Sequence, residues 1–124
     1  MSEIRANTVS NAAGTGPVTL TGQSAAKSFC YFNGNGTLAV YTTFNTSSVT
    51  DNGTGLYTVS MTNAMSNVYY SKVATGGRDS TANQDRWLGL YDATTSSFKV
   101  QAQFAAAANQ ADSQVSTCIL GDLA

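Results

Sequence analysis

The chain contains no histidine. This residue is absent from all 124 positions. Histidine is the commonest general base, the central member of the usual nucleophile triads and a frequent zinc ligand. Its absence therefore excludes the most common hydrolytic sites and most zinc sites.

Charged residues are also scarce, at 10% of the chain, and the net charge is −1. The basic residues are scattered through the sequence: Arg5, Lys27, Lys72, Arg78, Arg86 and Lys99. Because they form no basic stripe, we expect neither nucleic-acid binding nor attachment to an anionic membrane surface. No apolar run approaches the roughly 20 residues of a membrane-spanning helix. The N-terminus has no basic segment followed by an apolar one, which predicts synthesis in the cytoplasm.

Small and neutral polar residues take the place of the missing charges, while 42% of the residues are hydrophobic. The length corresponds to one domain, with or without an extra arm, and is sufficient for a hydrophobic core. A surface with so little charge does not keep copies apart. We therefore expect an oligomer or a component of an assembled particle.

Short segments of alternating polarity, separated by polar turns, extend from residue 28 to the C-terminus. The clearest is 56–62, where Tyr57, Val59 and Met61 alternate with Thr58 and Ser60. Similar segments occur at 28–32, 37–44, 67–74, 86–92, 96–104 and 113–120. Seven or eight strands at this spacing predict an all-β fold, an antiparallel β-sandwich of jelly-roll-like form.

The connections carry recognisable turn sequences. Segment 33–36 (NGNG) predicts a hairpin, because the Asn-Gly pair supplies positive φ angles. Segment 51–55 (DNGTG) lacks the alternating oxygen ligands and terminal glutamate of a calcium loop, so we interpret it as another tight turn. Segment 75–85 has no large apolar residue, and we expect it to be the longest loop.

The first 27 residues differ from the rest. They contain a weak strand pattern at 3–9 and a glycine-rich turn that ends at Pro17, the single proline. An isolated segment with so few apolar side chains cannot offset its ordering entropy, so it must pack on something else. We therefore divide the chain into an N-terminal arm and linker (1–27) and a β-sandwich domain (28–124). The apolar residues expected to dock the arm are Ile4, Val9, Val18 and Leu20.

The carboxylates offer one route to catalysis without histidine. Asp79 with Asp85, or Asp85 with Asp92, are the pairs that glycoside cleavage would use. Nothing in their spacing requires such a pair, and aspartates are common in the turns of β proteins. We predict a protein that is not an enzyme, with no cofactor and no metal site.

The two cysteines, Cys30 and Cys118, lie in apolar segments near opposite ends of the domain. Free cysteine is among the most buried residue types, which favours two buried thiols. A disulfide is the alternative, because the first and last strands of a sandwich are often neighbours. Synthesis in the cytoplasm makes it the less favoured one.

Aromatic residues flank the predicted long loop at Tyr69, Tyr70, Trp87 and Tyr91. Such residues form platforms for neutral sugars, although core packing or a subunit interface explains them equally well. The candidate contacts for a glycan or receptor are Arg78, Asp79, Trp87 and Tyr91.

Two motifs carry a resemblance to a known group of proteins. The first is SEIRANTVSNAAGTGPVTLTGQSAAKSFCYFNGNGT, an EIR-N-T arm followed by an A-A-K-aromatic strand, and the second is FNTSSVTDNGTGLYTVSMTNAMSNVYY. Over residues 2–74 the chain resembles small tail-fibre and virion structural proteins of marine and cyanobacterial bacteriophages. The resemblance implies a homotrimeric structural protein of the phage particle and supplies no catalytic residues.

Tail fibres of this kind carry a long shaft and an anchoring domain, which this sequence does not contain. We therefore expect the arm to be the anchor of a short particle-surface protein. The expected roles are a capsid decoration or cement protein, a head fibre or a short tail-fibre component, made in the host cytoplasm and bound to capsid or tail proteins. The alternative is an adhesin tip that binds a host surface glycan.

Overall fold

A computed structural model describes Ala13 and residues 25–77, 86–104 and 109–124, which form eight strands and no helix. The strands are β1 (Ala26–Asn33), β2 (Ala39–Phe44), β3 (Thr46–Gly53), β4 (Leu56–Met61), β5 (Ser71–Gly77), β6 (Arg86–Tyr91), β7 (Ser97–Phe104) and β8 (Gln114–Leu120).

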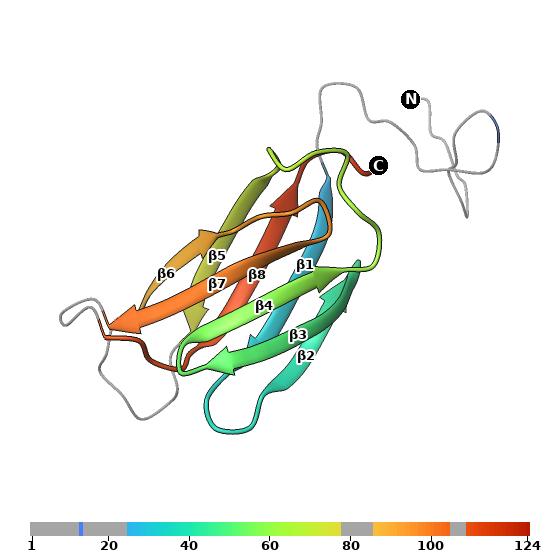
Figure 1. The fold of residues 1–124 in the computed structure, drawn as a ribbon. Helices are drawn as coiled ribbons and strands as arrows, with labels where there is room; N and C mark the ends of the chain where they lie inside the picture. The colour runs from blue at the N-terminus through green and yellow to red at the C-terminus, as the bar shows by residue number, and fades with distance from the viewer. Residues whose placement is uncertain (1–12, 14–24, 78–85, 105–108) are drawn as a thin grey trace, which may run out of the picture.

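The strands form two four-stranded antiparallel sheets packed face to face (Figure 1). Sheet A has the order β2-β1-β8-β5, and sheet B has the order β3-β4-β7-β6. The hairpins β1–β2, β3–β4 and β6–β7 stay within one sheet, whereas the other connections pass from one sheet to the other. The predicted antiparallel β-sandwich is therefore confirmed, and its first and last strands are neighbours.

The core lies between the sheets and follows the alternation of the strands. In β4, Tyr57, Val59 and Met61 are buried and the intervening residues are not. The other core residues are Cys30, Phe32, Phe98, Val100, Ala102, Val115 and Ile119 of β1, β7 and β8, with Met65 and Tyr70 of the β4–β5 connection. Burial of one large apolar side chain stabilises a fold by about 1.5–3 kcal/mol, so this cluster supplies most of the driving force.

The turn at Asn33–Gly36 joins β1 to β2, as its sequence predicts. Gly36 has the expected positive φ of 68°, and Asn33 Oδ1 accepts a hydrogen bond from the Asn35 backbone N–H at 3.0 Å. Gly34 has a different role, because a Cβ at this position would overlap with the hydroxyl of Tyr57. Its missing side chain is therefore required by the core and not by the backbone conformation.

The corner between β2 and β3 depends on Asn45. This residue has a φ of 52°, which asparagine tolerates better than most residues. Its Nδ2 donates to the Lys27 carbonyl at 2.9 Å, and its Oδ1 accepts from the Asn63 N–H at 2.7 Å. One side chain thereby joins the beginning of β1 to the β4–β5 connection.

Strand β3 was not predicted. The predicted segments leave out 45–50, and 51–55 is interpreted as a tight turn. The structure extends β3 to Gly53, and the turn is confined to Thr54 and Gly55. Val49 is the single large apolar residue of this edge strand, so alternation of polarity is too weak there to indicate a strand.

Other boundaries also shift. The strand expected at 67–74 begins at Ser71 and continues to Gly77, so the first residues of the predicted loop 75–85 belong to β5. Residues 78–85 lie outside the described part. Ala26 and Lys27 belong to β1, which begins two residues before the first predicted segment at 28–32. A regular strand needs only backbone pairing, which β8 provides to both segments.

Candidate functional site

The outer face of sheet A carries an apolar row that crosses all four strands. Phe44 of β2 pairs with Phe29 of β1, Phe29 pairs with Cys118 of β8, and Cys118 pairs with Val73 of β5. Phe44 and Val73 are about half exposed, at 52% and 51%. The rings of Phe29 and Phe44 stack with their centroids 5.7 Å apart. We call this row and its neighbours Tyr31, Tyr41 and Leu120 the apolar face.

A second, more polar row lies beside the first. Tyr31 and Tyr41 have ring centroids 5.2 Å apart, and the Tyr31 hydroxyl donates to Gln114 Oε1 at 2.9 Å. The charged residues of these four strands are Lys27 and Lys72, and Lys72 lies on the inner side opposite Ile119. The apolar face is therefore aromatic over β2 and β1 and almost free of charge.

The outer face of sheet B has another character. Trp87, Gly89 and Tyr91 point outward from the edge strand β6 and pair with Gln103, Gln101 and Lys99 of β7. Trp87 and Tyr91 are exposed by 56% and 41%. We call Trp87, Gly89, Tyr91, Gln101 and Gln103 the aromatic–amide strip.

Gly89 makes the strip flat between its two aromatic side chains. A Cβ at Gly89 would meet only Trp87, at 3.9 Å from Cζ3 and 4.0 Å from Cη2, so the edge of the indole lies beside the outer side of Gly89. The side-chain amides of Gln101 and Gln103 have no hydrogen-bond partner among the described residues. They remain available to a ligand.

Lys99 and Asp92 form an ion pair at one end of the strip, and both side chains are exposed. The hydrogen bond from Lys99 to Asp92, with the attraction between their charges, raises the pKa of the Lys99 ammonium. The ammonium also lies 5.9 Å from the centroid of the Tyr91 ring. The two charges offset each other, so the strip presents no net charge to a ligand.

The structure separates the four aromatic residues that the sequence suggested as one platform. Trp87 and Tyr91 share the outer face of β6. Tyr70 instead is buried, and its hydroxyl donates to the Thr94 carbonyl at 2.8 Å. Burial raises its pKa. Tyr69 is 91% exposed in the β4–β5 connection. The prediction that all four aromatic residues share one sugar-binding platform is therefore wrong for Tyr70, which belongs to the core.

Several predicted site residues lie outside the described part of the chain. They are the arm residues Ile4, Val9, Val18 and Leu20, and the loop residues Arg78 and Asp79. The expectations that concern them stay predictions.

Asp51 and Asp112 accept hydrogen bonds in turns and connections, the role predicted for aspartates in a β protein. Asp51 accepts a hydrogen bond from the Gly53 N–H at 2.9 Å, and Asp112 accepts from the Gly55 N–H at 2.8 Å. The buried Tyr57 hydroxyl also donates to Asp112, at 3.2 Å, and burial raises the pKa of this tyrosine. Asp79 and Asp85 lie outside the described residues. Within the described residues, no group of three His, Cys, Asp or Glu side chains is arranged to hold a metal ion.

The two cysteines lie on opposite sides of sheet A, although their strands are adjacent. Cys30 is buried in the core, whereas Cys118 is half-buried on the apolar face, and both thiols are free. Residues of opposite orientation on paired strands cannot form a disulfide without moving the backbone. The expectation of two buried thiols is therefore right for Cys30 and wrong for Cys118. Burial raises the pKa of the Cys30 thiol to about 11.

The apolar face, Gly89 and the two glutamines were not among the candidate residues predicted from the sequence. One signal was present for the face, because β1 has apolar residues at four consecutive positions: the outward Phe29 and Tyr31 alternate with the inward Cys30 and Phe32. A strand that is apolar on both sides is covered on both sides. No comparable signal marks Gly89, whose role depends on the position of the Trp87 ring.

The chain matches no family model, no curated protein and no solved structure in comparisons with each of these. The part of the chain that the structure describes contains no helix long and apolar enough to cross a membrane. The proposal for the function therefore rests on the resemblance, on the fold and on the outer faces of sheets A and B.

Proposed function

We propose that this chain is a non-enzymatic structural protein of a bacteriophage particle, which assembles as a homotrimer through the apolar face. The arm, residues 1–27, docks the trimer to a capsid or tail protein, and sheet B faces outward. The role is that of a capsid decoration or cement protein, a head fibre or a short tail-fibre component. The phage context comes from the resemblance over residues 2–74.

The apolar face is the observation that carries the self-association. Contiguous exposed apolar surface on a soluble domain marks an interaction site, and subunit interfaces are depleted in charge and enriched in aromatic residues. Phe29, Phe44, Tyr31 and Tyr41 give this face such a composition. Lys27 is the one charged residue on the outer side of these four strands. The face therefore has almost no charge with which to attract a charged partner. A second copy of the same face is equally uncharged.

The distribution of side chains favours a ring over a two-fold dimer. The β2–β1 half carries the large rings of Phe44, Phe29 and Tyr31, whereas the β8–β5 half carries the smaller Cys118 and Val73. A cyclic assembly joins two different patches, the first half of one copy to the second half of the next. Large side chains on one half and small ones on the other complement each other in that arrangement.

Light scattering coupled to size-exclusion chromatography tests the assembly. The expected mass is three times the 12.9 kDa of the chain. Phe44→Lys on the edge strand β2 should give a folded monomer, because the interface would have to bury an unpaired charge. Thr50→Lys is the matched control, since Thr50 is exposed on the edge strand of the other sheet. A wild-type monomer, or a trimer that survives Phe44→Lys, contradicts the proposed interface.

Deletion of residues 1–22 tests the docking role of the arm. The shortened protein should keep the fold and the trimer but no longer enter phage particles. Normal incorporation of the shortened protein would contradict the docking role without affecting the interface. Antibody labelling of intact particles would then distinguish a head location from a tail location.

A further inference from the structure

The geometry points to the aromatic–amide strip on sheet B as a binding site for a neutral, extended oligosaccharide. This inference deepens the proposed function by naming what the displayed sheet contacts. It does not require the trimer, because the strip lies on β6 and β7 of one copy.

The two aromatic rings supply the stacking surface. The C–H groups on one face of a pyranose ring carry partial positive charge and pack on the negative face of an aromatic ring. Trp87 and Tyr91 are both exposed on the same side of β6, four residues apart. Four residues along a strand correspond to roughly 13 Å. One sugar therefore contacts one ring, and only a chain of several sugars contacts both.

Gly89 provides the space between the rings. Any side chain at this position would stand above the strand where a bound sugar chain must pass. The glycine has no positive φ, and a Cβ there would make only ordinary contacts with Trp87 at 3.9–4.0 Å. Neither the backbone conformation nor the packing requires glycine at this position. What the missing side chain provides is a flat surface over the strand.

The amides of Gln101 and Gln103 supply the polar part of the site. They lie on β7 opposite Gly89 and Trp87 and have no partner among the described residues. A primary amide both donates and accepts hydrogen bonds, which matches a sugar hydroxyl. Lys99, the charged residue of β7, lies on the outer side of this strand and pairs with Asp92, which follows β6. A neutral ligand is therefore favoured over an anionic polysaccharide.

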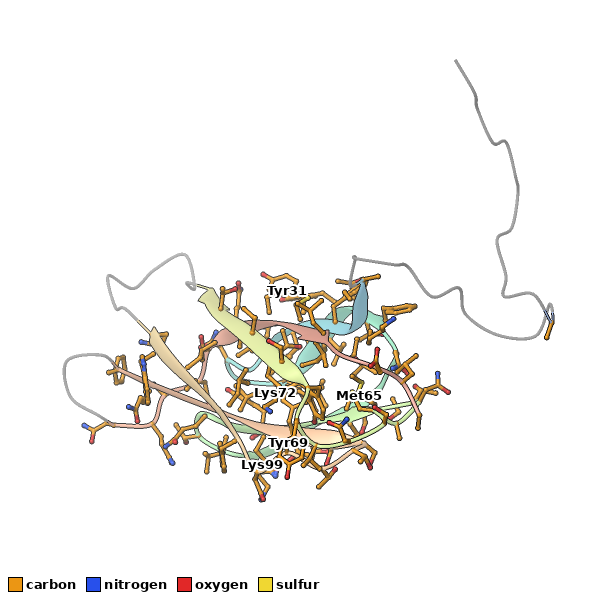
Figure 2. The ribbon with its side chains drawn as sticks, turned by 90° about the horizontal axis from the view of Figure 1, so that it is seen from above. Tyr31, Met65, Tyr69, Lys72 and Lys99 are labelled. Atoms are coloured by element: carbon orange, nitrogen blue, oxygen red, sulfur yellow. The ribbon has the colours of Figure 1, made fainter. Side chains whose placement is uncertain are left out.

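Figure 2 places Lys99, at the end of the strip, and Tyr31, on the apolar face, on opposite sides of the sandwich. The site thus remains exposed when the apolar face is covered by another copy. A peptide added to the free edge of β6 is the competing occupant, because an edge strand presents unpaired backbone groups. Such a peptide would bind through the backbone and would depend less on the Trp87 ring.

Isothermal titration calorimetry of the full chain with four neutral hexasaccharides tests the site. The probes are cellohexaose, xylohexaose, mannohexaose and N-acetylchitohexaose, with the corresponding monosaccharides beside them. At least one hexasaccharide should bind, and its monosaccharide should bind at least about tenfold more weakly, because it reaches one ring only. Absence of binding by all four hexasaccharides overturns the inference.

Three substitutions assign the binding to the strip. Trp87→Ala, Tyr91→Ala and Gly89→Val should each weaken it by about tenfold or more. Tyr69→Ala is the control, because Tyr69 is exposed and aromatic but belongs to the β4–β5 connection. Binding that survives the three substitutions, or that Tyr69→Ala abolishes, overturns the assignment. Circular dichroism confirms the fold of each variant, and Trp87→Phe keeps a ring if Trp87→Ala does not fold.

Light scattering on the same samples separates the two proposals. A trimer without sugar binding contradicts the glycan site alone, and a monomer that binds sugar contradicts the apolar interface alone.

Discussion

The outer faces of sheets A and B differ although their strands share one core and one alternation pattern. Sheet A presents Phe29, Phe44 and Val73, with hardly any charge. The two central strands of sheet B present mostly Ser, Thr and Gln, with Leu56 and Lys99, and its aromatic residues Trp87 and Tyr91 are confined to the edge strand β6. An apolar face that crosses all four strands of a sheet is suited to burial against another subunit. Separate rings among amides are suited to a ligand that remains partly hydrated.

The largest expected effect is on the stability of the core, which supports both outer faces. Gly34→Ala places a Cβ against the buried Tyr57 hydroxyl. Overpacking of this kind typically costs about 1–3 kcal/mol, and the rigid tyrosine puts this site at the upper end. Urea denaturation should show this loss of unfolding free energy. Gly36→Ala, with a positive φ of 68° but nothing within 4 Å, should cost less, about 1 kcal/mol. The reverse order would contradict the packing role of Gly34.

The next effect concerns the two halves of the apolar face. Val73→Lys on β5 should weaken assembly by about 2–3 kcal/mol, or roughly a hundredfold in Kd, because a cyclic interface also buries this half. Sedimentation velocity over a range of concentrations measures the change. If Val73→Lys assembles as the wild type does while Phe44→Lys does not, the aromatic half packs on itself and the ring is wrong.

A smaller effect distinguishes the two thiols. Cys118 on the apolar face should react with iodoacetamide in a monomeric Phe44→Lys variant and about tenfold more slowly in the assembled wild type, where it is covered. Cys30 should stay unreactive in both at pH 8, because its raised pKa leaves little thiolate. Mass spectrometry of the alkylated peptides gives both rates. Equal rates for Cys118 in the two proteins would contradict a covered apolar face.

The same thiol predicts how stability depends on pH. The pKa of Cys30 is about 11 in the fold and close to the ordinary value of about 8.5 in the unfolded chain. As pH rises, the unfolded chain loses this proton first. The contribution of Cys30 is therefore complete below about pH 8.5 and is lost as pH rises through 11. Urea midpoints should decrease over this range, and a Cys30→Ala variant should show a smaller decrease.

The smallest effect concerns the ion pair on sheet B. Lys99→Met should leave the urea midpoint unchanged, because exposed pairs contribute little to stability. Binding of a neutral hexasaccharide should likewise be unchanged, and it should not respond to added salt. A strong salt dependence would indicate a charged ligand and contradict the neutral strip.

Much of the fold follows from local patterns. The alternation in β4, β7 and β8 predicts their buried residues correctly, because one side of each strand faces the core. The Asn-Gly turn at Asn35–Gly36 is also predicted, since its requirement for positive φ is local. The same reasoning fails for β3, where Val49 alone marks the inner side. It fails for Tyr70 as well, whose burial depends on the carbonyls of Thr94 and Ser97 in a distant connection.

The sequence by itself determined the all-β class, the buried sides of the central strands, the low charge and the absence of a histidine-based site. These properties depend on composition and on contacts between near neighbours. Only the tertiary structure decided which strands share a sheet, and therefore that Phe44, Phe29, Cys118 and Val73 form one row. It also decided that Gly34 leaves room for the Tyr57 side chain and that Gly89 lies beside the Trp87 ring. These roles depend on pairing between residues far apart in the chain or on the orientation of a ring, and the local sequence predicts neither of them.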